Sequence, residues 1–209
     1  MRVGILGTGD VGKALGRGFV TLGHEVKMGG REAKNPKAEA WAREMGPKAS
    51  SGSFADAAEL GEVVVLATPG TVSESVLAAA GPDRLAGKVL IDATNPVGAQ
   101  GLMLSGNDSG GEQVQRLAPR ARVVKAFNTV GHALMFRPEL PGGPPDMLIA
   151  GNDAAAKKTV AEILGAFGWG AVDIGGIESS RYLEAMCVAW IRATRALGSR
   201  DIAFKLLRK

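Results

Sequence analysis

The feature that most constrains this chain is a glycine-rich turn near its N-terminus. Residues 3–6 form a short apolar run that predicts a buried strand, and the residues after the turn repeat apolar side chains with helical period. Between a strand and a helix, three such glycines permit a tight turn, a close approach to a pyrophosphate and close helix packing. This context favours a dinucleotide-binding turn over a glycine-rich turn without a ligand. The turn consists of Gly7, Thr8, Gly9, Asp10, Val11 and Gly12.

The end of the predicted second strand, residues 24–28, favours NADP over NAD. An NAD site usually has Asp or Glu at this point to accept the ribose hydroxyls, whereas this chain continues into Gly30 and Arg31. A guanidinium binds a 2′-phosphate through two parallel hydrogen bonds, and Lys34 adds a positive charge nearby. Glu32 lies beyond the arginine and is expected in the turn. The alternative is a solvated basic loop ahead of a helix.

Composition points to one globular domain, residues 1–209, with 45% hydrophobic residues. No apolar run is long enough to span a membrane, and strand begins at the N-terminus, so we expect a cytoplasmic protein with no signal peptide and no membrane contact. One cysteine, Cys187, and two histidines are too few for a metal site. The net charge of +4 is scattered and aromatics are scarce, which indicates an anionic cofactor and no nucleic acid.

Strands and helices alternate along nearly the whole chain, which predicts an α/β fold. We expect a single doubly wound Rossmann-type domain with a mostly parallel sheet and a C-terminal helix. A third strand over residues 49–54 is brief at most, and residues 97–111 form a glycine- and serine-rich loop. The other predicted strands cover residues 3–6, 24–28, 62–67, 88–92, 122–126, 147–150 and 171–174.

The carboxyl ends of these strands predict the site, because ligands of doubly wound sheets bind there. The nicotinamide is expected near Thr68, Asn95 and Asn128. Asn95 either orients the carboxamide or only terminates its strand. Asn128 carries a donor and an acceptor on a short side chain, so we predict a positioning role for it in catalysis; the alternative is that it caps a turn. His132 is a candidate proton donor, but we expect it to be a solvent-exposed residue at a helix start.

Several blocks of this sequence resemble the coenzyme F-420 (F420)-dependent NADP oxidoreductases and the cytosolic reductase domain of membrane metalloreductases. The most diagnostic blocks are residues 123–129, Val-Val-Lys-Ala-Phe-Asn-Thr, and residues 175–184. The resemblance covers nearly the whole chain and implies one Rossmann domain that holds NADP and stacks a deazaflavin on the nicotinamide. It implies that Thr8, Gly9, Asp10 and Val11 hold the pyrophosphate, that Gly30 and Arg31 hold the 2′-phosphate, and that Thr68, Pro69, Asn128 and Val130 surround the hydride-transfer site.

The sequence departs from several deazaflavin enzymes at residues 128–131, where they carry His-Thr-Ile-Pro and this chain has Asn-Thr-Val-Gly. This leaves the second ligand open between F420 and a flavin, FMN or FAD. The predicted function is hydride transfer between NADP(H) and one of these small-molecule redox partners. The alternatives are an imine or small-acid reductase related to pyrroline-carboxylate reductase, which would need a longer helical domain after the Rossmann half, and a non-catalytic NADP sensor.

The resemblance also implies a homodimer, and the C-terminal helix agrees with it. Tyr182, Met186 and Ala193 lie on one apolar face of this helix, and residues 202–207 add an apolar tail. Together they exceed what one sheet edge needs as cover.

Overall fold

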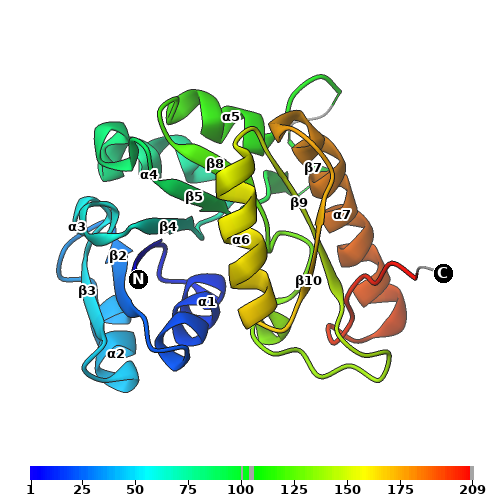
Figure 1. Ribbon diagram of the computed structural model, residues 1–209, viewed down its shortest axis with the longest axis horizontal. Helices are drawn as coiled ribbons and strands as arrows, with labels where there is room; N and C mark the ends of the chain where they lie inside the picture. Colours follow the sequence, from blue (N-terminus) through cyan, green and yellow to red (C-terminus); the bar gives the residue numbers. More distant parts are fainter. Residues whose placement is uncertain (100, 104–105, 208–209) are drawn as a thin grey trace.

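Eight strands form one sheet in the order β10-β9-β8-β5-β4-β1-β2-β3 (Figure 1). The computed structural model of the chain describes residues 1–99, 101–103 and 106–207. From β3 to β8 the order is that of a doubly wound Rossmann sheet, so the predicted fold class is confirmed. The strands are β1 (Arg2–Leu6), β2 (Glu25–Gly30), β3 (Ala49–Ser53), β4 (Val63–Leu66), β5 (Val89–Asp92), β8 (Arg122–Lys125), β9 (Asp146–Gly151) and β10 (Gly170–Asp173).

Helices cover both faces of the sheet. Because side chains alternate along a strand, Val63 and Val65 of β4 point into one core, and Val64 and Leu66 point into the other. The first core contains α1 (Asp10–Thr21), α2 (Pro36–Met45) and α6 (Ala154–Ala166). The second contains α3 (Phe54–Leu60), α4 (Ser73–Ala80) and α5 (Gly110–Leu117).

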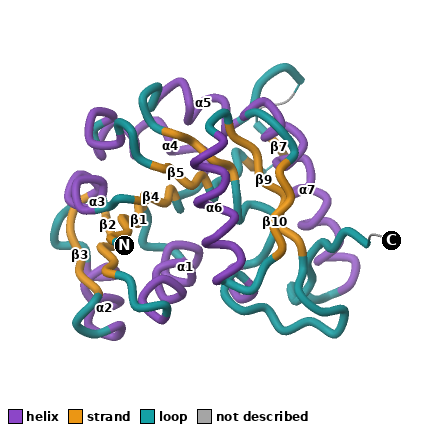
Figure 2. The backbone as a smooth tube through the Cα atoms, in the orientation of Figure 1, coloured by secondary structure: helices purple, strands orange, loops and turns teal. Residues whose placement is uncertain are grey.

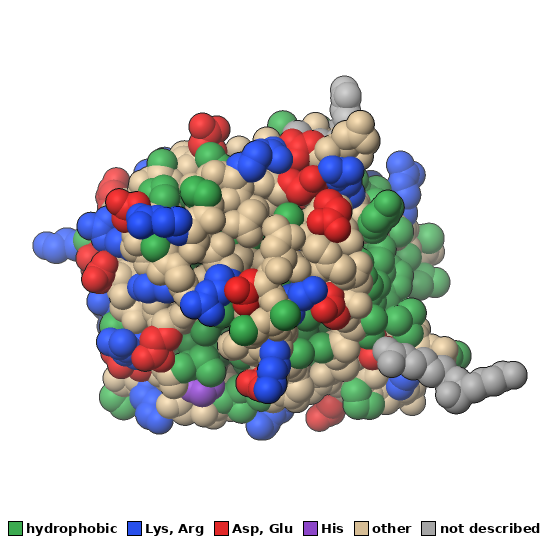
Figure 3. Space-filling model, turned by 45° about the horizontal axis from the view of Figure 1, so that its top comes forward, with side chains coloured by type: hydrophobic (Ala, Val, Ile, Leu, Met, Phe, Trp, Pro, Cys, Tyr) green, Lys and Arg blue, Asp and Glu red, His purple; other side chains and the backbone are tan. Residues whose placement is uncertain are grey.

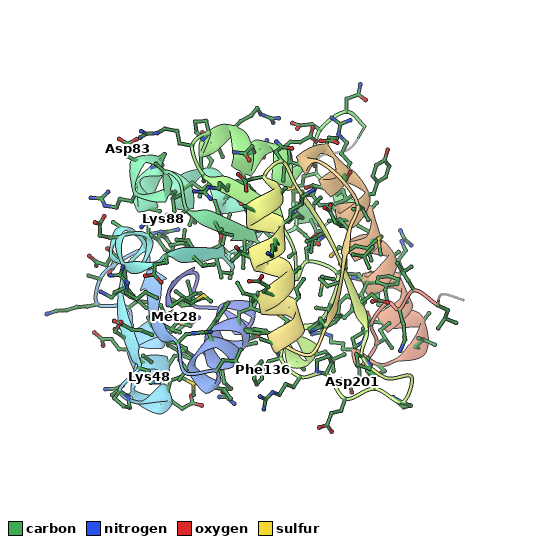
Figure 4. The ribbon with its side chains drawn as sticks, viewed as in Figure 1. Met28, Lys48, Asp83, Lys88, Phe136 and Asp201 are labelled. Carbon is green, nitrogen blue, oxygen red and sulfur yellow. The ribbon has the colours of Figure 1, made fainter. Side chains whose placement is uncertain are left out.

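The sheet is parallel except between β8 and β9, so the predicted mostly parallel sheet is confirmed. A parallel neighbour would need a crossover that returns the chain to the start of β8. Residues 126–145 instead contain only a short 3-10 helix, η3 (His132–Leu134), and enter β9 from the opposite end. Phe136 fixes this link at one end of α6, where its ring packs edge-on against Phe167 at 5.1 Å between centroids (Figure 4).

Two segments differ from the sequence prediction. The third strand, β3, is a full five-residue strand paired with β2 along its whole length; its small polar residues suit the edge of the sheet. The predicted loop at residues 97–111 contains a short hairpin of β6 (Val97–Gly98) and β7 (Gly101–Leu102) beside the last helix (Figure 2). It also ends early, because Ser109 caps α5 by accepting a hydrogen bond from the Glu112 amide.

The C-terminal helix, α7 (Ser180–Leu197), does not bury the face that the sequence predicts as apolar; it buries the neighbouring face instead. Leu183 and Cys187 point inward, whereas Tyr182 is 69% exposed and Leu197 is 67% exposed. Burial raises the pKa of the Cys187 thiol to about 11, so it stays protonated at neutral pH. Figure 3 shows hydrophobic side chains gathered on the side of the molecule where α7 lies. Among the described residues, no helix is both long and apolar enough to cross a membrane.

Candidate active site

The glycine turn has the backbone geometry that its sequence predicts. Gly7 has a φ of +139°, and a Cβ there would lie 2.4 Å from the Ala67 carbonyl oxygen. A Cβ on Gly12 would lie 2.3 Å from the Gly7 carbonyl oxygen, so α1 can pack this closely on β1 only with glycine. A Cβ on Gly9 would meet no atom within 4 Å. The turn is therefore packed tightly against protein at its two ends and open in the middle, as close approach by a ligand requires.

The N-terminus of α1 is free to bind an anion. Gly9 is the N-cap residue and no side chain caps the helix. The first amide groups of α1 point outward at this end, and the helix dipole adds partial positive charge. A phosphate at this position would be bound by the backbone of Thr8, Asp10 and Val11 without a basic side chain.

A cleft of about 820 Å³ extends from the glycine turn to the end of β2. It brings Gly30, Arg31, Thr68 and Pro69 together with the turn, whereas Lys34 is absent from its lining. A role for Lys34 therefore remains a prediction. Glu32, which the sequence predicts only in the turn, lines the cleft beside Arg31. Further lining residues are Gly7, Thr8, Gly9, Asn35, Phe54, Ala67, Val72, Ser75, Val76 and Ala79.

Asn95 and Asn128, which the sequence predicts at the nicotinamide, do not line this cleft; they follow the ends of the neighbouring strands β5 and β8 and bond to each other. Asn95 Nδ2 donates to the Asn128 carbonyl oxygen at 2.8 Å, and Asn128 Nδ2 donates to Asn95 Oδ1 at 3.0 Å. Asn128 Nδ2 also donates to the Leu183 carbonyl oxygen of α7 at 3.0 Å. Asn128 Oδ1 and Thr68 Oγ1 are buried without a hydrogen-bond partner among the described residues. Two polar atoms in this region thus have unused bonding capacity, which is costly unless a ligand or water takes it up.

The backbone before Asn128 is strained. Phe127 has a φ of +61°, which is uncommon for a bulky residue. Its side chain is buried, with its ring 5.7 Å from that of Phe167, and this packing compensates the strain. The turn at Phe127 follows the end of β8 and leads the chain through Asn128 to Val130.

The sequence reasoning missed a buried ion triad behind these asparagines. Lys125 Nζ lies 3.0 Å from Asp92 Oδ2 and 2.8 Å from Glu184 Oε1, and all three side chains are essentially inaccessible to solvent. Burial by itself would lower the pKa of the Lys125 ammonium, but the two carboxylates outweigh it and hold this pKa above its ordinary value. A signal existed in the sequence, because Asp92 and Lys125 each end a strand directly after buried apolar residues.

The triad connects four parts of the chain. Asp92 Oδ1 accepts hydrogen bonds from the Thr94 amide at 2.9 Å and the Thr94 hydroxyl at 2.7 Å. The two oxygens of Glu184 accept from the amides of Gly110 and Gly111, each at 3.0 Å, at the start of α5. The ends of β5 and β8, the start of α5 and the helix α7 are therefore joined through one buried group of charges.

Outside this cluster, His132 lies on the surface as expected. It is exposed at the start of η3 and borders a groove of about 310 Å³ with Asp10, Lys13 and Arg17. Within residues 1–99, 101–103 and 106–207, no three His, Cys, Asp or Glu side chains gather in a way that could hold a metal ion.

Comparisons with known proteins identify relatives of this chain. The family model described as "NADP oxidoreductase coenzyme F420-dependent" matches residues 2–96. The F420-dependent NADP reductase of Methanocaldococcus jannaschii is 30% identical over 201 residues, covering 89% of each chain. A crystal structure of a putative F420-dependent NADP reductase from Arthrobacter sp. FB24 has a TM-score of 0.92 and 39% identity, covering 99% of both chains.

A further relative is much longer than this chain. The metalloreductase STEAP3 of Rattus norvegicus is 35% identical over 187 residues, which is 88% of this chain and 36% of that protein. The chain therefore spans about a third of the length of this relative.

Proposed function

The chain belongs to the family of F420-dependent NADP oxidoreductases, and on this premise we propose that it transfers a hydride between NADP(H) and F420 or a flavin. One observation carries this proposal. The cleft contains the glycine turn, Arg31 and the unpartnered hydroxyl of Thr68, and Asn128, whose Oδ1 is also unpartnered, follows a parallel strand that ends at the same edge of the sheet. We further infer that residues 1–209 act as one NADP-binding domain, since their eight main strands form a single sheet.

The residues present fit NADP along its length. The open backbone at Gly9 and the uncapped start of α1 suit the pyrophosphate. Gly30 and Arg31 border the cleft where the 2′-phosphate would lie, and a guanidinium can bind it with two parallel hydrogen bonds. Asn128 Oδ1 and Thr68 Oγ1 can accept hydrogen bonds from a carboxamide, which would satisfy both.

The protein's part in hydride transfer is to position the rings and exclude water. NADPH supplies the hydride when it is bound, and the acceptor ring takes it. Thr68, Asn95 and Asn128 lie at the nicotinamide end as orienting groups. Pro69 and Val130, beside them in the sequence, supply apolar surface for a ring face. Because little further chemistry is needed, accurate placement accounts for the rate.

The acceptor is identified by assaying NADPH oxidation with F420, FMN, FAD and pyrroline carboxylate. We expect turnover with at least one of the tricyclic acceptors and none with the imine. Oxidation by pyrroline carboxylate alone would support the imine-reductase alternative. Tight NADPH binding without oxidation by any acceptor would support the sensor alternative.

Replacement of Arg31 tests the preference for NADP. Arg31→Ala is expected to weaken NADP binding by about 1.5–3 kcal/mol, the contribution of a charge-assisted hydrogen bond, and to leave NAD binding nearly unchanged. Calorimetric titration of both dinucleotides measures the difference. Arg43→Ala, at an exposed arginine of α2 outside the cleft, is the matched control and should change neither affinity. Equal losses for NADP and NAD would contradict the assignment of Arg31.

Asn128→Ala tests the nicotinamide end. We expect hydride transfer to slow by about one to two powers of ten, because small misplacements strongly affect such steps, with NADP affinity little changed. The variant also loses the hydrogen bond to the Leu183 carbonyl, so a lower melting temperature is expected. Single-turnover rates are therefore compared per folded molecule. A destabilised variant with a normal rate would show that Asn128 has only a structural role.

We also propose that two copies associate through the outer face of α7. This face exposes Tyr182 and Leu197, and Met103 from the neighbouring β6–β7 segment is 63% exposed. Contiguous apolar surface of this kind is typical of interfaces. A homodimer formed about a two-fold axis would bury the same face of both copies.

Light scattering tests the association. We expect twice the chain mass of 21.5 kDa at micromolar concentrations. Ala189→Arg, in the middle of this face, should give the monomer because it places a charge in the interface. Ala155→Arg, at an exposed position of α6, should leave the dimer intact. A wild-type monomer across this concentration range would refute the proposal.

A further inference from the structure

We propose that the buried triad of Asp92, Lys125 and Glu184 is a positioning device that holds the nicotinamide end of the site in its productive geometry. The inference rests on the proposed hydride transfer. It assigns a function to three buried residues that do not line the cleft.

Each member of the triad holds a segment that ends at the site. Asp92 binds the amide and hydroxyl of Thr94, and the next residue is Asn95. Lys125 ends β8, three residues before Asn128. Glu184 lies beside Leu183, whose carbonyl oxygen accepts the hydrogen bond from Asn128. The two asparagines thus bond to each other, and the triad holds the three segments that carry or contact them.

The triad also binds both ends of the segment that connects β5 to α5. This segment leaves the sheet at Thr94, which Asp92 holds, and returns at Gly110 and Gly111, which Glu184 holds. A Cβ on Gly110 would lie 3.2 Å from Pro96, so the two ends pack directly on each other. The Gly70 amide donates to the Asn95 carbonyl oxygen at 3.2 Å, which links the residues after β4 to the same group of contacts.

Stability alone is a poor reason for this arrangement. Two carboxylates and one ammonium are removed from water, and apolar side chains of similar volume often stabilise a protein as well as a buried ion pair does. Val89, Leu90, Ile91, Val123 and Val124 fill the neighbouring buried positions of β5 and β8. What charged groups add is direction, since each hydrogen bond fixes the distance and angle of the backbone that it holds.

Glu184→Gln separates positioning from folding. The substitution keeps the side-chain volume and removes one negative charge from a buried group that carries an excess of one. Its NH₂ group cannot accept a hydrogen bond from the amide of Gly110 or Gly111. The matched control is Glu112→Gln, because Glu112 also joins α5 to α7, through Arg181 at 2.6 Å, without touching the strand ends.

Three measurements are compared per folded molecule: affinity for adenosine 2′,5′-bisphosphate, the fluorescence of bound NADPH, and the rate of hydride transfer. For Glu184→Gln we expect an unchanged bisphosphate affinity, a bound NADPH emission closer to that of free NADPH, and a rate at least about tenfold lower. Glu112→Gln should match the wild type in all three. A wild-type rate and emission in Glu184→Gln would overturn the proposal, and so would an equal change in both variants.

The fluorescence reports the nicotinamide environment without an acceptor, so it distinguishes this proposal from the proposed function. If no acceptor oxidises NADPH with the wild type, the proposed hydride transfer is refuted. An emission change confined to Glu184→Gln would still support the positioning role of the triad.

Thr94→Val gives an independent test, because it replaces the hydroxyl bound to Asp92 with a methyl group of similar size and leaves the three charges of the triad in place; rates and emission are again compared per folded molecule. We expect it to lower the rate and shift the NADPH emission in the same direction, and Thr94→Ser to restore both. Equal behaviour of the Val and Ser variants would contradict a positioning role for this link.

Discussion

At the proposed nicotinamide end of the site, one ammonium is buried between two carboxylates. The cost of removing these charges from water is offset only if every member is well bonded. Lys125 contacts both acids, Asp92 also binds Thr94, and Glu184 also binds two amides of α5. Because the partners come from β5, β8 and α7, the charges can be satisfied only when these elements are assembled together.

The two ends of the site are built in physically different ways. The proposed adenosine and pyrophosphate end relies on backbone shape, namely the glycines of the turn, the uncapped start of α1 and the end of β2. The proposed nicotinamide end relies on the side chains of Asn95 and Asn128, which bond to each other, and Asn128 also donates to the backbone carbonyl of Leu183. Affinity and rate should therefore respond to different substitutions, since binding energy and ring placement come from different residues.

The last helix connects the site with the surface. Its inner face supplies Glu184 and the Leu183 carbonyl oxygen, and its outer face exposes Tyr182 and Leu197. A second copy on the outer face would restrain the same helix that holds the triad. In the proposed dimer, α7 would thus both form the interface and hold the nicotinamide end in place.

The sequence by itself determined the features that depend on local geometry. The glycine spacing, the absence of an acid before Arg31 and the alternation of strands with helices can be read without knowing any distant contact, because φ angles and side-chain periodicities are local properties. Tertiary structure alone decided the antiparallel β9, the pairing of Asn95 with Asn128 and the burial of Lys125 between Asp92 and Glu184. These depend on which strands become neighbours and in which register, and residues 59 positions apart along the chain, such as Lys125 and Glu184, form their contact only after the sheet has assembled.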